Sequence, residues 1–104
     1  MNDNNTDTLQ SVVADTHIAV IGLGYVGLPL AIELSKKYDV LGFDINEGRI
    51  SELRQGKDST KEADLADLAA VMELQKSATI GLSFSSAVED LRRYNTFIIT
   101  VPIF

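Results

Sequence analysis

Short apolar runs alternate along this chain with longer stretches of helical periodicity. The run at 18–21 is almost wholly apolar, rich in β-branched residues and stopped by a glycine, which is typical of a strand buried on both faces of a parallel sheet. Apolar residues then recur at helical spacing over 26–34, and the lysines at 36–37 suit the carboxyl end of a helix. Pro29 falls in the first turn of that helix, where its missing N–H does least harm.

The same alternation continues to the end of the chain. The next expected elements are a strand at 39–44, a helix from Asn46 to a stop at Gly56, a helix at about 62–76, a half-exposed strand at 79–84, a short helix from Ser86 to about Tyr94 and a strongly apolar strand at 97–101. Asparagine is a favourable N-cap, and glycine commonly follows the end of a helix. Ser86 and Glu89 have the spacing of a capping box.

Strands that alternate with helices in this way imply a parallel sheet with right-handed crossovers. We therefore expect an α/β fold of Rossmann type, a partial doubly wound sheet in strand order 3-2-1-4 with flanking helices. Residues 1–16 are polar and rich in Asn, Asp and Thr, and we expect them to form a disordered tail. The remaining residues, 17–104, are enough for a single domain.

Composition removes several classes of function. Nine Lys and Arg against fifteen Asp and Glu give a net charge of −6, which disfavours a nucleic-acid partner. No apolar run approaches the ~18–20 residues that span a bilayer, so we expect no membrane segment. The absence of cysteine excludes a disulfide, a thiolate zinc site and a cysteine nucleophile within these residues, and the acids suggest no metal site. With no export signal at the start, we expect a cytoplasmic location.

The most informative motif is Gly-Leu-Gly-Tyr-Val-Gly at 22–27, a G-x-G-x-x-G pattern between an expected strand and an expected helix. In this setting Gly22 allows a tight turn, Gly24 lets a pyrophosphate approach the backbone, and Gly27 lets the helix pack closely on the strand. Free N–H groups in the first helical turn hold the phosphates. The motif predicts a dinucleotide site; a glycine turn without a ligand is the alternative.

Asp44 lies at the end of the second strand, 22 residues after Gly22, close to the ~20 expected of an acid that binds the adenosine ribose. Its carboxylate would repel a 2′-phosphate, so we expect NAD rather than NADP. Arg49, five residues later, either approaches the adenine or ribose or is an ordinary exposed helix charge. The single histidine, His17, is distant from the glycine turn in sequence and is expected to be solvated.

Several segments resemble the start of the UDP-glucose/GDP-mannose dehydrogenase family: 18–31, Gly-Phe-Asp-Ile-Asn at 42–46, Arg-Ile at 49–50, Gly-Lys-Asp at 56–58 with Thr60 and Glu62, and Thr-Val-Pro at 100–102. The branch acting on UDP-N-acetylhexosamines and uronates is the most similar. Tyr-Val inside the glycine motif distinguishes this family from hydroxyisobutyrate and 6-phosphogluconate dehydrogenases. The resemblance, over about 17–102, implies the amino-terminal NAD-binding domain of an enzyme that oxidises the C6 alcohol of a UDP-sugar to a carboxylate for polysaccharide biosynthesis.

By position, the resemblance implies that Tyr25 and Val26 contact the pyrophosphate, Asp44 the adenosine ribose and Arg49 the adenosine end. The family's Val-Pro-Thr-Pro segment reads Val-Pro-Ile-Phe at 101–104, so a threonine contact is missing. The family's catalytic cysteine, its catalytic lysine and its sugar-binding domain lie beyond the fourth strand. We therefore assign no catalytic residue here, expect a UDP-sugar only as the partner of a full-length enzyme, and expect this fragment alone to be inactive.

Other functions stay open at this stage. The same turn serves a non-catalytic nucleotide-binding module, a hydroxyacid dehydrogenase or a methyltransferase that binds S-adenosylmethionine. The apolar strand at 97–101 would be an interior strand of a complete doubly wound sheet, and it carries neither charge nor proline. Such a strand at the edge of a sheet attracts other strands, so we expect a homo-oligomer.

Overall fold

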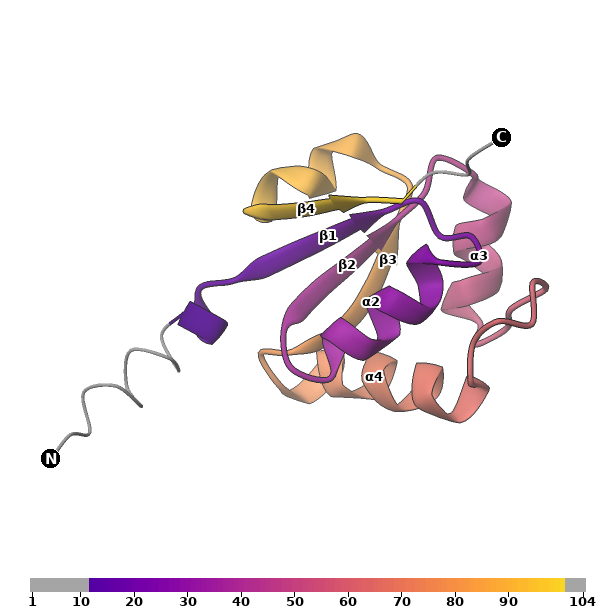
Figure 1. Cartoon of the computed structure of the whole chain (residues 1–104), viewed down its shortest axis with the longest axis horizontal. Helices are drawn as coiled ribbons and strands as arrows, with labels where there is room; N and C mark the ends of the chain where they lie inside the picture. Colours follow the sequence, from indigo (N-terminus) through magenta and orange to yellow (C-terminus); the bar gives the residue numbers. More distant parts are fainter. Residues whose placement is uncertain (1–11, 101–104) are drawn as a thin grey trace, which may run out of the picture.

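The computed structural model describes residues 12–100, and its centre is a four-stranded parallel sheet. The strands are β1 (His17–Ile21), β2 (Asp39–Phe43), β3 (Gly81–Ser85) and β4 (Thr96–Ile99). Their order is β3-β2-β1-β4, and all three neighbouring pairs are parallel. The expected α/β class and the order 3-2-1-4 are confirmed, with β3 and β4 at the two edges (Figure 1).

Helices α2 (Gly27–Ser35) and α4 (Leu65–Ser77) lie side by side against the sheet, and α3 (Glu47–Arg54) packs near the end of β3 (Figure 1). The short 3₁₀ helix η1 (Val88–Arg93), drawn in orange, lies beside β4. Apolar side chains of the sheet and helices form one core with almost no solvent exposure. Its most buried members include Val20, Val40, Leu82, Leu28 and Leu68.

Helix α3 begins and ends as its sequence predicts. The Asn46 side chain accepts a hydrogen bond from the amide of Arg49 at 3.1 Å, which satisfies one free N–H of the first turn. Gly56 follows the helix with φ +76°, a left-handed conformation that favours glycine. Helix α2 ends at Ser35, so the two lysines follow its last turn instead of lying in it.

Helix α4 begins at Leu65, and the expected start at residue 62 is wrong. The Asp58 carboxylate accepts the amides of Glu62 and Ala63, each at 2.9 Å, and holds these residues in a turn. Asp64 then caps the helix by accepting two amides of its first turn. Side chains that bind nearby backbone groups compete with the helix for the same donors, which explains the later start.

Two expectations for the following segment are also corrected. Strand β3 is buried rather than half-exposed, because α3 and α4 pack against it although it is an edge strand. The segment at 88–93 is a 3₁₀ helix, and the capping box at Ser86 and Glu89 does not start it. The Ser85 hydroxyl accepts from the amide of Ala87 at 2.9 Å and donates to Asp90 at 2.6 Å, so the local bonds begin one residue earlier.

Residues 12–16 join the domain through Asn95, the residue before β4. The Asn95 side chain donates to the Asp15 carbonyl at 2.6 Å, and its backbone amide donates to the His17 carbonyl at 2.9 Å. Of the disordered tail expected at 1–16, residues 1–11 lie outside the described residues, as does the departure from the family pattern at 101–104. Within 12–100, no helix is long and apolar enough to cross a membrane.

Candidate functional site

The glycine turn connects the carboxyl end of β1 to helix α2. Gly22 has φ +99°, where a side chain would be strained, and a Cβ there would overlap the Thr100 carbonyl oxygen. A Cβ at Gly27 would overlap the Gly22 carbonyl oxygen. These two glycines therefore permit the tight turn and the close approach of helix to strand.

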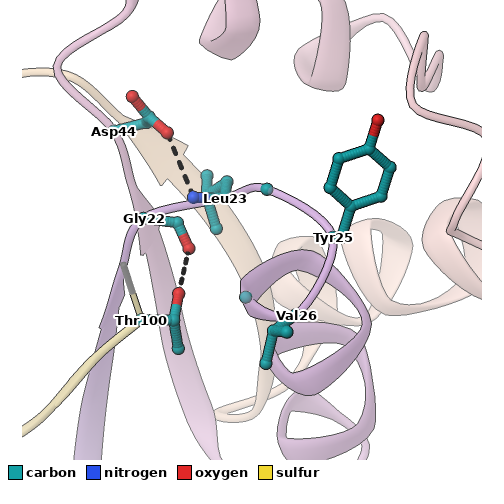
Figure 2. Close-up of a pocket in the computed structure, with 8 residues that line it drawn as sticks. Gly22, Leu23, Tyr25, Val26, Asp44 and Thr100 are labelled. Carbon is teal, nitrogen blue, oxygen red and sulfur yellow. Dashed lines mark hydrogen bonds between the residues drawn. The ribbon is translucent and has the colours of Figure 1, made fainter. Parts of the chain in front are cut away.

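Three side chains from other elements hold this turn in place. The Thr100 hydroxyl donates to the Gly22 carbonyl at 2.7 Å, and the Leu23 amide donates to the Asp44 carboxylate at 3.0 Å (Figure 2). Arg49 Nε donates to the Leu23 carbonyl at 2.8 Å. The ends of β2 and β4 and the first turn of α3 thus converge on two residues of the turn.

A pocket of about 340 Å³ opens beside the turn. Residues 22–27 line it together with Asp44 and Thr100. Tyr25 and Val26 are two-thirds exposed, and Figure 2 shows the Tyr25 ring projecting away from the turn. Of the predicted site residues, the structure brings together the glycines, Tyr25, Val26 and Asp44.

The chemistry of this pocket fits the diphosphate and adenosine ribose of a dinucleotide. A Cβ at Gly24 would meet no atom within 4 Å, so a phosphate group has room to approach the backbone there. In the described residues no side chain caps the start of α2, which leaves the positive end of the helix dipole for an anion. Asp44 accepts one amide on each carboxylate oxygen, from Leu23 and Asn46, both at 3.0 Å. Each oxygen retains a lone pair for a ribose hydroxyl.

The structure decides against one of the two sequence-based interpretations of Arg49. Its side chain is only 9% exposed, so the alternative of an ordinary exposed charge is wrong. It is not among the residues that line the pocket; its guanidinium binds the Leu23 carbonyl and the Asp58 carboxylate, each at 2.8 Å. Its contact with adenosine stays a prediction.

The structure adds Asp58, whose side chain has no exposed surface. It accepts hydrogen bonds from the amide and hydroxyl of Thr60, from Arg49 and from the two amides that precede α4. Burial alone would raise the pKa of Asp58, but the hydrogen bonds from Thr60 and Arg49 outweigh it and hold the pKa far below its usual range. The sequence signal for this turn is Asp-Ser-Thr, since aspartate often binds the amide two residues later.

Thr100 is the second residue that sequence reasoning did not place in the site. Its position follows from the strand order, because parallel strands 1 and 4 end at the same edge of the sheet. His17 lies at the opposite end of β1, where its Nδ1 is 2.8 Å from the Asp39 carboxylate and its side chain is 36% exposed. The histidine is therefore partly exposed, paired and remote from the turn.

Comparison with known proteins gives a consistent match. The sequence model described as the UDP-glucose/GDP-mannose dehydrogenase family, NAD binding domain, matches residues 16–103. A UDP-N-acetyl-D-glucosamine 6-dehydrogenase from Pseudomonas aeruginosa is 56% identical over 88 residues, covering 85% of this chain and 19% of the relative.

Solved structures show the same likeness in three dimensions. A UDP-D-ManNAc dehydrogenase from Pyrococcus horikoshii superposes with a TM-score of 0.73 at 40% identity, over 83% of this chain and 20% of that one. GDP-mannose dehydrogenase from Pseudomonas aeruginosa, solved as a ternary complex, gives a TM-score of 0.69 at 29% identity, over 84% and 20%. The chain spans about a fifth of the length of the relatives it matches.

Proposed function

This chain belongs to the UDP-glucose/GDP-mannose dehydrogenase family, as its NAD-binding domain, and on that premise we propose that it holds the adenosine half of NAD for a nucleotide-sugar 6-dehydrogenase. The proposed reaction oxidises the C6 alcohol of a UDP-N-acetylhexosamine to a carboxylate. This four-electron oxidation takes an oxygen atom from water and releases two hydrides in two steps, and NAD⁺, when bound, supplies the acceptor for one hydride in each step. The substrate class is supported by the names of the relatives, which act on UDP-linked N-acetyl sugars.

One observation carries the proposal: the glycine turn and Asp44 line the same pocket. Backbone amides of residues 24–27 would hold the diphosphate, since the net charge of −6 offers no basic patch for it. Asp44 would accept the adenosine ribose hydroxyls. Tyr25 and Val26, exposed at the mouth of the pocket, would cover the diphosphate.

The wider setting of the chain belongs to the same proposal. Uronates of this kind feed the synthesis of capsule or O-antigen polysaccharides in bacteria, and such biosynthesis would take place in the cytoplasm. We assign the chain no nucleic-acid partner, because its acidic charge disfavours a phosphate backbone. A homo-oligomer is supported by the exposed edge of β4, on which Phe97 and Ile99 are 49% and 67% exposed.

The decisive experiment is a calorimetric titration of the chain with ADP-ribose, comparing wild type with Gly24→Val. Because a Cβ at residue 24 meets no protein atom, this variant should keep its thermal stability and lose binding by closing the approach to the backbone. Ala70→Val, on the exposed surface of α4, is the matched control and should bind as wild type does. Wild-type affinity in Gly24→Val, or no binding by the wild type, would overturn the proposed site.

A further inference from the structure

Both backbone polar groups of Leu23 are held by side chains from elsewhere in the chain. Its amide donates to Asp44 at 3.0 Å, and its carbonyl accepts from Arg49 Nε at 2.8 Å. Leu23 itself is 1% exposed, so its carbonyl lies where an unmade hydrogen bond would be costly. The peptide groups on either side of Leu23 are thereby fixed, and the second of them leads directly to Gly24.

Arg49 is suited to this task because its guanidinium makes several bonds at once in one plane. While Nε binds the Leu23 carbonyl, Nη1 lies 2.8 Å from the Asp58 carboxylate and 3.3 Å from that of Glu52. Nη2 lies 3.4 Å from the Thr60 hydroxyl. The orientation of the guanidinium is set by these acids, so the side chain presents Nε to the turn in a fixed position.

Asp58 also organises the connection between α3 and α4. Besides Arg49 it binds the amide of Thr60 at 3.0 Å and the amides of Glu62 and Ala63 at 2.9 Å. One buried carboxylate therefore joins the connection at 57–63 to the guanidinium that holds the glycine turn. Neither Arg49 nor Asp58 lines the pocket, and the Leu23 carbonyl is the point at which this pair contacts the glycine turn.

We infer that Arg49, anchored by Asp58, is a positioning residue for the dinucleotide site: it sets the Leu23 peptide so that the Gly24 backbone faces the diphosphate. The inference rests on the proposed function and adds the 57–63 connection to the support of the site. A turn that is ordered before the ligand arrives loses less conformational entropy on binding, which raises affinity without a new contact.

Arg49→Lys is the informative substitution. Lysine keeps the charge beside Asp58, but its single nitrogen does not reproduce the separate bond to the Leu23 carbonyl. Arg54→Lys is the matched control, because Arg54 lies on the same helix and donates to another backbone carbonyl, that of Phe84, at 2.7 Å. Both variants lose an arginine–carbonyl bond, and only Arg49→Lys touches the turn.

We expect Arg49→Lys to weaken ADP-ribose binding about tenfold, the order of one hydrogen bond to a charged group, and Arg54→Lys to leave it unchanged. Asp58→Asn should weaken binding in the same direction. Because the two residues act in series, the double variant Arg49→Lys/Asp58→Asn should lose about as much affinity as one of the single variants. Its loss should be smaller than the product of the two single losses. The free energy of unfolding, measured for each variant, distinguishes a loss of binding from a loss of stability.

Amide NMR spectra of the ligand-free chain test the positioning without a ligand. The Leu23 and Gly24 amides should shift in Arg49→Lys and stay in place in Arg54→Lys. Equal affinity of Arg49→Lys and wild type, or an equal loss in both arginine variants, would overturn the inference. If the wild type binds no ADP-ribose, the proposed function fails, and unchanged Leu23 and Gly24 amides in Arg49→Lys would then reject the positioning role as well.

Discussion

Asp44 serves the fold and the proposed ligand with one carboxylate. Each oxygen accepts a backbone amide, one from the glycine turn and one from the start of α3. These bonds orient the carboxylate toward the pocket that it shares with residues 22–27. A phosphate on the 2′ position of the ribose would meet this negative charge.

We therefore predict that ADP-ribose binds more tightly than its 2′-phosphorylated form, by about 1–3 kcal/mol. Asp44→Ala should narrow this difference, and calorimetric titration of both ligands measures it. Glu73→Ala, an equal change of charge on the exposed surface of α4, should leave the difference intact. Equal affinities in the wild type would contradict the assignment of Asp44.

The lowered pKa of Asp58 makes the stability of the fold depend on pH. Its pKa is lowered by folding from an ordinary value of 3.8, so the unfolded chain takes up the proton first as the pH falls. The stabilisation that this lowered pKa contributes is fully present above pH 3.8. It is lost as the pH drops from there toward the pKa of the folded chain.

We predict that the free energy of unfolding falls more steeply in the wild type than in Asp58→Asn between about pH 5 and about pH 3. Urea unfolding at several pH values measures the two slopes. Other acids titrate in both proteins, so the difference between the two slopes reports the titration of Asp58 alone. Parallel slopes would show that its carboxylate is not held in this way.

Among the described helices, α4 has the N-cap that makes the most hydrogen bonds. Asp64 accepts the amides of Ala66 and Asp67 at 2.9 and 3.1 Å and supplies partners that the first turn otherwise lacks. It lies outside the pocket, so its effect on stability is separable from ligand binding.

Asp64→Ala should lower the free energy of unfolding by about 1 kcal/mol, the usual cost of losing an N-cap. Urea denaturation is the measurement. Glu73→Ala on the same helix is the control, and should stay within about 0.5 kcal/mol of the wild type. ADP-ribose affinity should be unchanged in both variants, and a matching loss in Glu73→Ala would show that the cap is not the cause.

At the scale of the whole molecule, the outstanding feature is the edge formed by β4. The strand pairs with β1 on one side and with no other strand among the described residues. Phe97 and Ile99 are among the exposed large apolar residues of residues 12–100. An unpaired edge with apolar side chains favours association with another strand.

We predict that the chain forms a homo-dimer or larger assembly through this edge, and that Ile99→Lys weakens it. Sedimentation at several concentrations is the test. Leu65→Lys, which changes an apolar residue of similar exposure on α4, should leave the assembly unchanged. A species of 11.3 kDa at every concentration would contradict the prediction.

The chain alone should not oxidise a nucleotide sugar. Its 104 residues include no cysteine, and it spans about a fifth of the relatives it matches. Incubation of the pure chain with NAD⁺ and a UDP-N-acetylhexosamine should produce no NADH by absorbance. Production of NADH by a sample free of any longer enzyme would refute this prediction.

The course of the chain could be predicted from its sequence because it depends on interactions between near neighbours. Apolar periodicity placed all four strands, the Asn46 cap and Gly56 bounded α3, and the spacing of strands and helices implied the order 3-2-1-4. The glycine motif and Asp44 were found together because the motif and the end of the next strand lie a fixed distance apart in this fold. Boundaries failed where side chains such as Asp58 and Ser85 took backbone amides from the expected helix.

What holds the site together was decided only by the tertiary structure. Sequence patterns did not indicate that Arg49 turns inward to Leu23 and Asp58, or that Thr100 closes on the Gly22 carbonyl. Leu23 and Arg49 are 26 residues apart, and Gly22 and Thr100 are 78 apart. These residues meet because parallel strands bring their carboxyl ends to one edge of the sheet, and there burial makes each polar group bond to whichever partner the fold places within reach.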